Sequence, residues 1–221
     1  MKVITVVSAK GGVGKTTLAA NLASVLAARG RRVIALDLDP QNALRLHFGI
    51  PLDSIDGLSR ATLAGDPWQT VMFNGVTVLP YGAVVEDDRR RFESHIDRDP
   101  QWLVQTLDTL GLDVADIVIV DTPPGSSVYT RTALCASNFA LNVVLADAAS
   151  YAAIPQMERM IEAYAAPRAN IVRGRRNCVA DGKFRRFKDL EQPDLHDTPH
   201  ALRPLDDVFR LDGAARVHPS N

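Results

Sequence analysis

The sequence predicts an α/β fold in three layers, with a mostly parallel sheet flanked by helices on both sides. Short β-branched runs, typical of strands buried on both faces, alternate with longer segments of helical periodicity along the first two-thirds of the chain. Strands separated by helices favour right-handed crossovers and parallel neighbours. This alternation stops near Pro167. We therefore expect one domain over 1–167 and an atypical C-terminal segment over 168–221.

The elements of this domain follow from their residue patterns. The expected strands are Val3–Val7, Val33–Asp37, Val76–Leu79, Ile117–Asp121 and Ala140–Leu145. The expected helices span 16–29, 42–48, 57–65, 101–110, 127–136 and 152–165. In the first helix Leu18, Leu22, Val25 and Leu26 fall on one apolar stripe, and Gly30 follows where helices commonly end.

Composition and charge limit the classes of protein to consider. The 221 residues are 46% hydrophobic and 23% charged, which is ordinary for a globular domain, and the formal net charge is −1. The segment 168–221 carries 11 Lys and Arg against 8 Asp and Glu, a net +3, which leaves −4 on 1–167. Cys135 and Cys178 form no CxxC pattern, and we find neither a signal peptide nor a membrane-spanning run. A cytoplasmic protein is expected.

The residues 9–17 read AKGGVGKTT and lie between a predicted strand and a predicted helix. Ala9 occupies the position where the strict Walker A motif requires glycine, so the loop matches the deviant form KGGxGK[ST] of P-loop NTPases. Glycines let the backbone turn its N–H groups towards phosphates, and the helix N-terminus adds a positive dipole end. The predicted ATP-binding residues are Gly11, Gly12, Val13, Gly14, Lys15, Thr16 and Thr17.

Two carboxylate motifs follow predicted strands and agree with this loop. In ALDLDPQN, Asp37 and Asp39 occupy alternate positions and so face the same side of the strand end. Asp121 ends an apolar strand in IVIVDTPPG, as the Walker B carboxylate does, and Gly125 offers a backbone N–H for sensing the γ-phosphate. The predicted Mg²⁺ site comprises Thr16, Asp37, Asp39 and Asp121.

The order and spacing of these motifs resemble the ParA/MinD family of deviant Walker A ATPases across 1–165. The segments LDLDPQNALRLHFGIPL, GLSRATLAGDPW, VLPYG and ADAASYAAIPQME are most similar to the BcsQ family of cellulose-biosynthesis proteins. This resemblance implies that Lys10 acts on the nucleotide of a second subunit. It also implies that Asp39 positions the attacking water and that Asp37 has a supporting role near Mg²⁺. The expected catalytic residues are therefore Lys10, Lys15 and Asp39.

The resemblance also implies a function. We expect an ATP-dependent homodimer with slow hydrolysis that assists the assembly or localisation of a cellulose synthase complex at the inner membrane, where partners would hold it peripherally. One alternative is a ParA-type partition ATPase that binds DNA, which the charge of −4 on 1–167 disfavours. Another is a scaffold that binds nucleotide without turnover.

The segment 168–221 departs from the family pattern and is expected to be divergent, truncated or disordered. Asn177 lacks the flanking residues of an adenine-binding asparagine and is left unassigned. His196 and His200, with Cys178 upstream, are too few and too separated by Pro199 to favour a zinc site. The basic residues of 173–188 favour a solvated tail over a contact with nucleic acid or anionic lipid.

Overall fold

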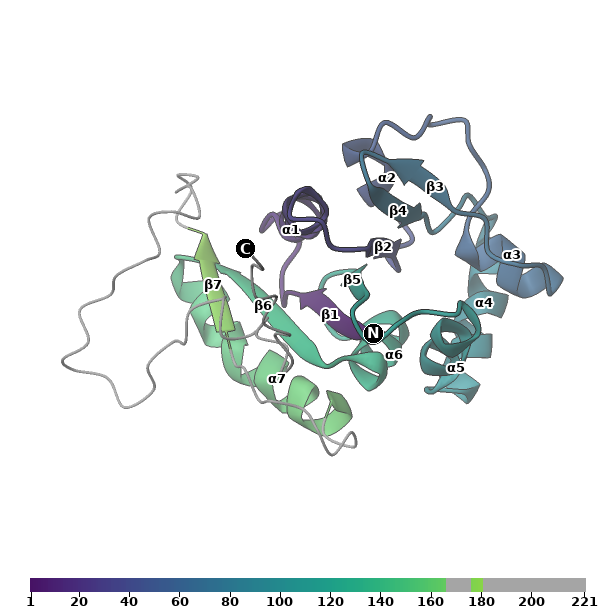
Figure 1. Ribbon diagram of the computed structural model, residues 1–221. Helices are drawn as coiled ribbons and strands as arrows, with labels where there is room; N and C mark the ends of the chain where they lie inside the picture. The colour runs from purple at the N-terminus through teal and green to yellow at the C-terminus, as the bar shows by residue number, and fades with distance from the viewer. Residues whose placement is uncertain (166–175, 181–221) are drawn as a thin grey trace, which may run out of the picture. The chain divides into compact units, whose positions relative to one another are not determined.

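The computed structural model describes residues 1–165 and 176–180, and these form an α/β fold around one sheet (Figure 1). The strands are β1 (Lys2–Val7), β2 (Val33–Asp37), β3 (Val71–Phe73), β4 (Val76–Leu79), β5 (Ile117–Asp121), β6 (Phe139–Leu145) and β7 (Arg176–Ala180). Their order in the sheet is β3-β4-β2-β5-β1-β6-β7. All neighbours are parallel except β3, which pairs antiparallel with β4. The mostly parallel sheet expected from the sequence is confirmed.

Helices cover the sheet on both faces. They are α1 (Lys15–Ala28), α2 (Leu44–His47), α3 (Leu58–Ala64), α4 (Glu86–Arg98), α5 (Trp102–Thr109), α6 (Val128–Ala136) and α7 (Ala148–Ala165). Figure 1 shows α1 on one side of the sheet and α6 with α7 on the other. The helix α1 packs on β1, β2 and β5, while α6 packs on β1 and is itself covered by α4, α5 and α7. The predicted three layers are therefore present.

The larger core cluster lies between the sheet and the helices α4, α5 and α6. Alternate residues of β5, Val118 and Val120, point into it because successive side chains of a strand face opposite sides. Phe92 and Ile96 of α4 meet them, and both are fully buried. These contacts hold α4 and α6 against this face of the sheet.

The apolar stripe of α1 differs from the one expected. Leu22 and Leu26 are buried, but Val25 is 46% exposed, so its assignment to the stripe was wrong. Ala19 and Ala23 complete the buried face instead. Small side chains at these positions let the helix lie close to the sheet, and this close packing turns Val25 towards solvent.

Three elements are present that the sequence pattern did not predict. The helix α4 has the sequence EDDRRRFESHIDR, and only Phe92 and Ile96 are buried in it. All three residues of β3 are exposed, so no buried alternation marks that strand. The strand β7 lies within the segment expected to be atypical and pairs parallel to β6. Of the three, β7 pairs with a strand distant in sequence, whereas β3 pairs with the adjacent strand β4 and α4 carries several ion pairs within itself.

The helix α7 begins at Ala148, four residues earlier than expected, and contains Pro155. Asp147 explains the earlier start. Its carboxylate accepts a hydrogen bond from the backbone N–H of Ser150 at 2.6 Å and another from the Ser150 hydroxyl at 3.1 Å. This is the geometry of an N-cap residue, which satisfies the free N–H groups of the first turn.

Gly57 holds α3 against the chain that leaves β4. A Cβ atom at this position would lie 2.2 Å from the backbone nitrogen of Gly82 and 2.5 Å from the carbonyl carbon of Tyr81. The two segments are also bonded, because the backbone N–H of Leu58 donates to the carbonyl of Pro80 at 2.9 Å. Only glycine permits this approach, which fixes the position of Tyr81.

We therefore expect Gly57→Ala to destabilise the fold by more than about 3 kcal/mol, because a backbone clash cannot be relieved by a side-chain rotation. Gly65→Ala at the other end of α3 is the matched control. Gly65 has a φ of 75° with open space around it, so alanine there should cost only about 1 kcal/mol. Denaturant unfolding measures both changes, and equal losses would contradict the steric explanation.

Candidate nucleotide-binding site

The residues between β1 and α1 form a loop built to receive an anion. Gly12 and Gly14 have φ values of 74° and 87°, a left-handed region that residues with a side chain rarely adopt. Val13 between them is buried and anchors the loop. The helix α1 has no side-chain cap and no acidic residue in its first turn. Its N-terminal N–H groups therefore offer hydrogen bonds and a positive dipole end to a phosphate.

Lys15 and Asp121 form a buried ion pair at the base of this loop. The distance from Lys15 Nζ to Asp121 Oδ1 is 3.1 Å, and the side chains are only 7% and 1% exposed. Burial raises the pKa of the Asp121 carboxyl, while the charge of Lys15 and a hydrogen bond from Thr16 act in the opposite direction. The second oxygen, Oδ2, is buried without a hydrogen-bond partner. A buried carboxylate oxygen of this kind is suited to accept a cation or its water.

Asp37 organises the turn that follows β2. Its Oδ1 accepts the backbone N–H of Asp39 at 2.9 Å, and its Oδ2 accepts that of Leu44 at 3.0 Å. Asp37 is fully buried and lies beside Asp121 in the parallel register of β2 and β5. Burial, and then the charge of Asp121, raise the pKa of Asp37 well above its ordinary range. The structure thus gives Asp37 a definite task, which is to fix the turn that carries Asp39.

The residues present fit a Mg²⁺ ion that keeps much of its water. Thr16 supplies a hydroxyl beside Asp121, and Asp39 is close enough for its charge to affect the pKa of Asp121. Within 1–165 and 176–180, however, no three His, Cys, Asp or Glu side chains gather into a metal-binding group. Mg²⁺ commonly takes one or two protein ligands and completes its shell with water and phosphate oxygens. The predicted set of Thr16, Asp37, Asp39 and Asp121 stays a prediction.

The segment 122–127 after β5 is tied directly to the phosphate loop. The backbone N–H of Gly125 donates to the carbonyl of Ser8 at 2.7 Å, and the Thr122 hydroxyl donates to the carbonyl of Val6 at 2.8 Å. Gly125 was expected to offer its N–H to a γ-phosphate. In this structure the N–H is already used, so a phosphate can engage it only if the bond to Ser8 opens.

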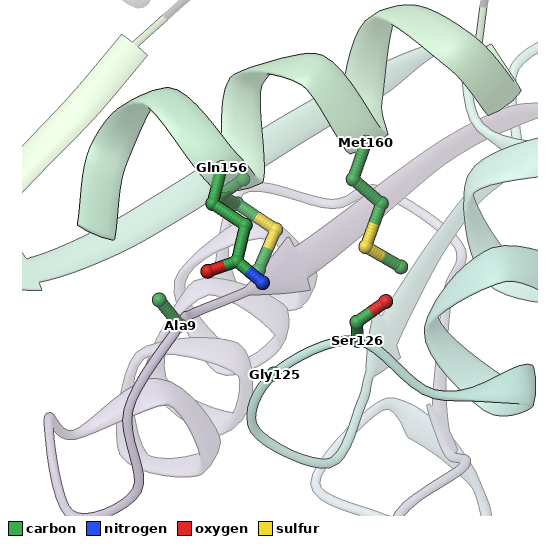
Figure 2. Close-up of a pocket in the computed structure, with 6 residues that line it drawn as sticks. Ala9, Gly125, Ser126, Gln156 and Met160 are labelled. Carbon is green, nitrogen blue, oxygen red and sulfur yellow. The ribbon is translucent and has the colours of Figure 1, made fainter.

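A small cavity of about 80 Å³ adjoins this segment. Figure 2 shows Gln156 and Met160 of α7 projecting towards the loop that carries Gly125 and Ser126, with Ala9 nearby. Packing is therefore incomplete on the α7 side of the loop. Such space gives the loop room to move without first displacing a packed core.

Lys10 points away from the buried pair and contacts α7. Its Nζ lies 3.4 Å from Oδ1 of Asp147, and both side chains are 43% exposed. The hydrogen bonds from Ser150 lower the pKa of Asp147 and keep its carboxylate charged. Sequence reasoning missed Asp147, because it lies 137 positions from Lys10 and follows no recognisable motif.

Known proteins resemble this chain in sequence and in fold. The family model described as "Cellulose biosynthesis protein BcsQ" matches residues 1–164. The chain belongs to the BcsQ family. BcsQ of Salmonella typhimurium is 26% identical over 159 residues, covering 67% of this chain and 60% of the relative. The chromosome partitioning protein ParA of Myxococcus xanthus is 34% identical over 153 residues, covering 63% of this chain and 50% of the relative. This BcsQ-family chain spans only about half the length of such relatives.

Solved structures support the same placement of this BcsQ-family chain. Cobyrinic acid a,c-diamide synthase from Mycobacterium smegmatis, solved with an ATP analog and magnesium, matches with a TM-score of 0.63 and 27% identity, covering 74% of this chain and 68% of that one. MinD from Pyrococcus horikoshii, solved with Mg-ADP, matches with a TM-score of 0.61 and 29% identity, covering 74% and 66%. The predicted ParA/MinD-like P-loop fold is confirmed.

Several predictions on 168–221 concern residues outside the described ranges. They include the expectation that His196 and His200 do not form a zinc site, the basic residues of 173–175 and 183–188, and the character of the segment outside β7. Within 1–165 and 176–180, no helix is long and apolar enough to cross a membrane.

The buried carboxylates predict a pH dependence. Because its pKa is raised on folding, Asp121 binds its proton more tightly in the folded chain, so folding loses stability as the pH rises above the unfolded value of about 3.9. Asp121→Asn removes the titrating carboxyl and keeps the shape of the side chain, so the variant should not lose this stability as the pH rises. Without nucleotide and Mg²⁺, we expect its melting temperature to rise relative to that of the wild type as the pH increases from about 4 until Asp121 is fully ionised. A variant less stable throughout would show that the pair with Lys15 dominates instead.

Proposed function

We propose that this chain binds ATP with Mg²⁺ and uses it to switch between a monomer and a homodimer. The observation that carries the proposal is the buried Lys15–Asp121 pair beneath the uncapped N-terminus of α1. Lys15 is held where phosphates would meet the helix end, and Asp121 with Thr16 would hold the Mg²⁺ ion, which would offset the charge of the phosphates. Relatives of similar fold were solved with Mg-ADP or with an ATP analog and magnesium.

Lys10 provides the link to a second subunit. It extends from the front of the loop towards solvent, and its partner Asp147 is equally exposed. Exposed ion pairs contribute little to stability and are screened by salt, so Lys10 is released easily. In the dimer it reaches the phosphates bound by the other subunit, where it stabilises the charge of the transition state.

Hydrolysis separates the two subunits and is expected to be slow. Asp39, on the turn fixed by Asp37, orients the attacking water. Gly125 donates its N–H to the γ-phosphate once its bond to Ser8 has opened. Loss of the γ-phosphate restores that bond, and Lys10 returns to Asp147.

In the cell, the switch assists the assembly or localisation of a cellulose synthase complex at the inner membrane. The support is membership of a family described as cellulose biosynthesis protein BcsQ. The protein itself works in the cytoplasm and reaches the membrane through its partners.

A panel of variants tests the switch. Lys15→Ala should weaken ATP binding by roughly 100-fold, since it removes a charge-assisted phosphate contact. Lys10→Ala should bind ATP normally but stay monomeric and hydrolyse about 100-fold more slowly. Asp39→Ala should dimerise with ATP and fail to release phosphate. Calorimetry, light scattering and phosphate release give these readouts, and Lys2→Ala at an exposed strand end is the control.

Two outcomes would change the proposal. Dimerisation of Lys10→Ala equal to the wild type would remove the role of this lysine across the interface. Equal phosphate release from Asp39→Ala and wild type would leave a nucleotide-binding scaffold without catalysis by Asp39.

A partition ATPase is the second candidate, because the Myxococcus xanthus ParA is 34% identical over its aligned part. A partition function predicts ATP-dependent, salt-sensitive binding to random duplex DNA that is lost in Lys10→Ala. The cellulose-linked function predicts equal DNA binding with ATP and ADP. It further predicts ATP-dependent co-purification with cellulose synthase from detergent-solubilised membranes. A DNA-binding assay in both nucleotides, at two salt concentrations, separates the two.

A further inference from the structure

Two buried tyrosines link the candidate site to α4. The hydroxyls of Tyr81 and Tyr129 are 2.9 Å apart, and the Tyr129 hydroxyl donates to Oε1 of Glu93 at 3.2 Å. The tyrosines are only 1% and 3% exposed. Burial raises the pKa of Tyr81 to about 12, so its hydroxyl stays protonated at physiological pH. The result is a polar connection through an aromatic core, where Phe92 packs edge-on against Tyr81.

The chemistry of the carboxylate fixes the direction of these bonds. Ionised Glu93 can only accept hydrogen bonds, so Tyr129 must donate to it. The oxygen of Tyr129 is then left to accept the proton of Tyr81. Arg89 forms ion pairs with Glu93 and with Glu86, which hold the acceptor in place on α4. Tyr81 therefore donates to Tyr129, and Tyr129 donates to Glu93. Without Glu93, the direction of the hydrogen bond between the two tyrosines would no longer be fixed.

The backbone of Tyr81 is bonded to the turn that carries Asp39. Its N–H donates to Oδ1 of Asn42 at 3.1 Å, in a buried contact. Asn42 adopts a φ of 52° and donates its own N–H to the carbonyl of Asp39 at 2.8 Å. On the other side, the Ser59 hydroxyl donates to the carbonyl of Tyr81 at 2.6 Å. The position of the Tyr81 backbone is thus tied to that of the Asp39 turn.

Tyr129 is joined to the segment 122–127 through the next residue of α6, Thr130. It is the second residue of α6, whose first turn is capped by the Ser127 hydroxyl accepting from the backbone N–H of Thr130 at 3.1 Å. The Thr130 hydroxyl in turn donates to the carbonyl of Gly125 at 3.1 Å. Since the N–H of Gly125 is bonded to Ser8, any opening of that bond acts on the start of α6.

We propose that the Tyr81–Tyr129 hydroxyl pair joins the Asp39 turn to the segment 122–127 and passes their nucleotide-dependent movement to α4 through Glu93. Tyr81 and Tyr129 are positioning residues, since neither is placed to touch the nucleotide. α4 is then an output element whose stability reports the state of the site. The inference rests on the proposed nucleotide switch, because it needs ATP and ADP to place the two segments differently.

Hydrogen exchange of the intact chain, followed by mass spectrometry of peptides that cover 86–98, tests the inference. The exchange is measured once with Mg-ADP and once with Mg²⁺ and a non-hydrolysable ATP analog. For the wild type we expect exchange rates in α4 to differ about fivefold between the two nucleotides, as typical coupling between sites gives. Tyr129→Phe and Tyr81→Phe should each bring the two rates together. Both should still bind the analog with wild-type affinity, a result that a general loss of folding would not produce.

Tyr151→Phe is the matched control, because Tyr151 is 76% exposed on α7 and should keep the fivefold difference. If Tyr129→Phe does not fold, Tyr81→Phe decides the question, since Tyr129 keeps Glu93 as its partner there. Wild-type α4 that exchanges equally in both nucleotides, or a difference that survives in the tyrosine variants, overturns the inference. Failure of the wild type to bind either nucleotide would instead overturn the proposed function itself.

Discussion

The structure depends on burying several charges together at the carboxyl end of a parallel sheet. Asp37 and Asp121 end neighbouring strands in register, and Lys15 is the cation that lies against Asp121. Burial raises the pKa of both carboxyls, and the charge of Asp121 raises that of Asp37 further, so the arrangement opposes folding when they are ionised. This unfavourable burial of charge suits the site to a ligand that brings a divalent cation and phosphates. Such a ligand would balance the charges of the buried carboxylates.

Two segments surround this charged centre, and different bonds hold each of them. The Asp39 turn is closed by the carboxylate of Asp37 and fastened to Tyr81 through Asn42. The segment 122–127 is fastened to the phosphate loop through Gly125, with a cavity on the α7 side of it. Both segments are held by several hydrogen bonds, but the second is less closely packed, on the side that faces α7. Rearrangement on ATP binding is expected to start in the second.

Lys10 shows how one residue can serve two states. Within a subunit it pairs with Asp147 at the start of α7, in a contact exposed to salt and water. The same exposure leaves its Nζ available to a second subunit.

The sequence alone determined the elements whose patterns are local. The strands β2, β4 and β5 begin and end at the residues expected, because continuous apolar runs mark strands buried on both faces. The phosphate loop and its carboxylates were likewise readable, since their chemistry requires particular residue types at fixed spacing. The charged helix α4 and the exposed strand β3 were not, because α4 buries only two residues and β3 buries none, so neither shows a clear apolar pattern.

Only the tertiary structure decided how the site residues are paired. No pattern in the chain indicates that Lys10 would meet Asp147, or that the N–H of Gly125 would already be bonded to Ser8. Local sequence fixes which groups are available, through residue type and backbone conformation. Partners more than 100 positions apart are chosen by the packing of the sheet and its helices, and that packing is a property of the whole fold.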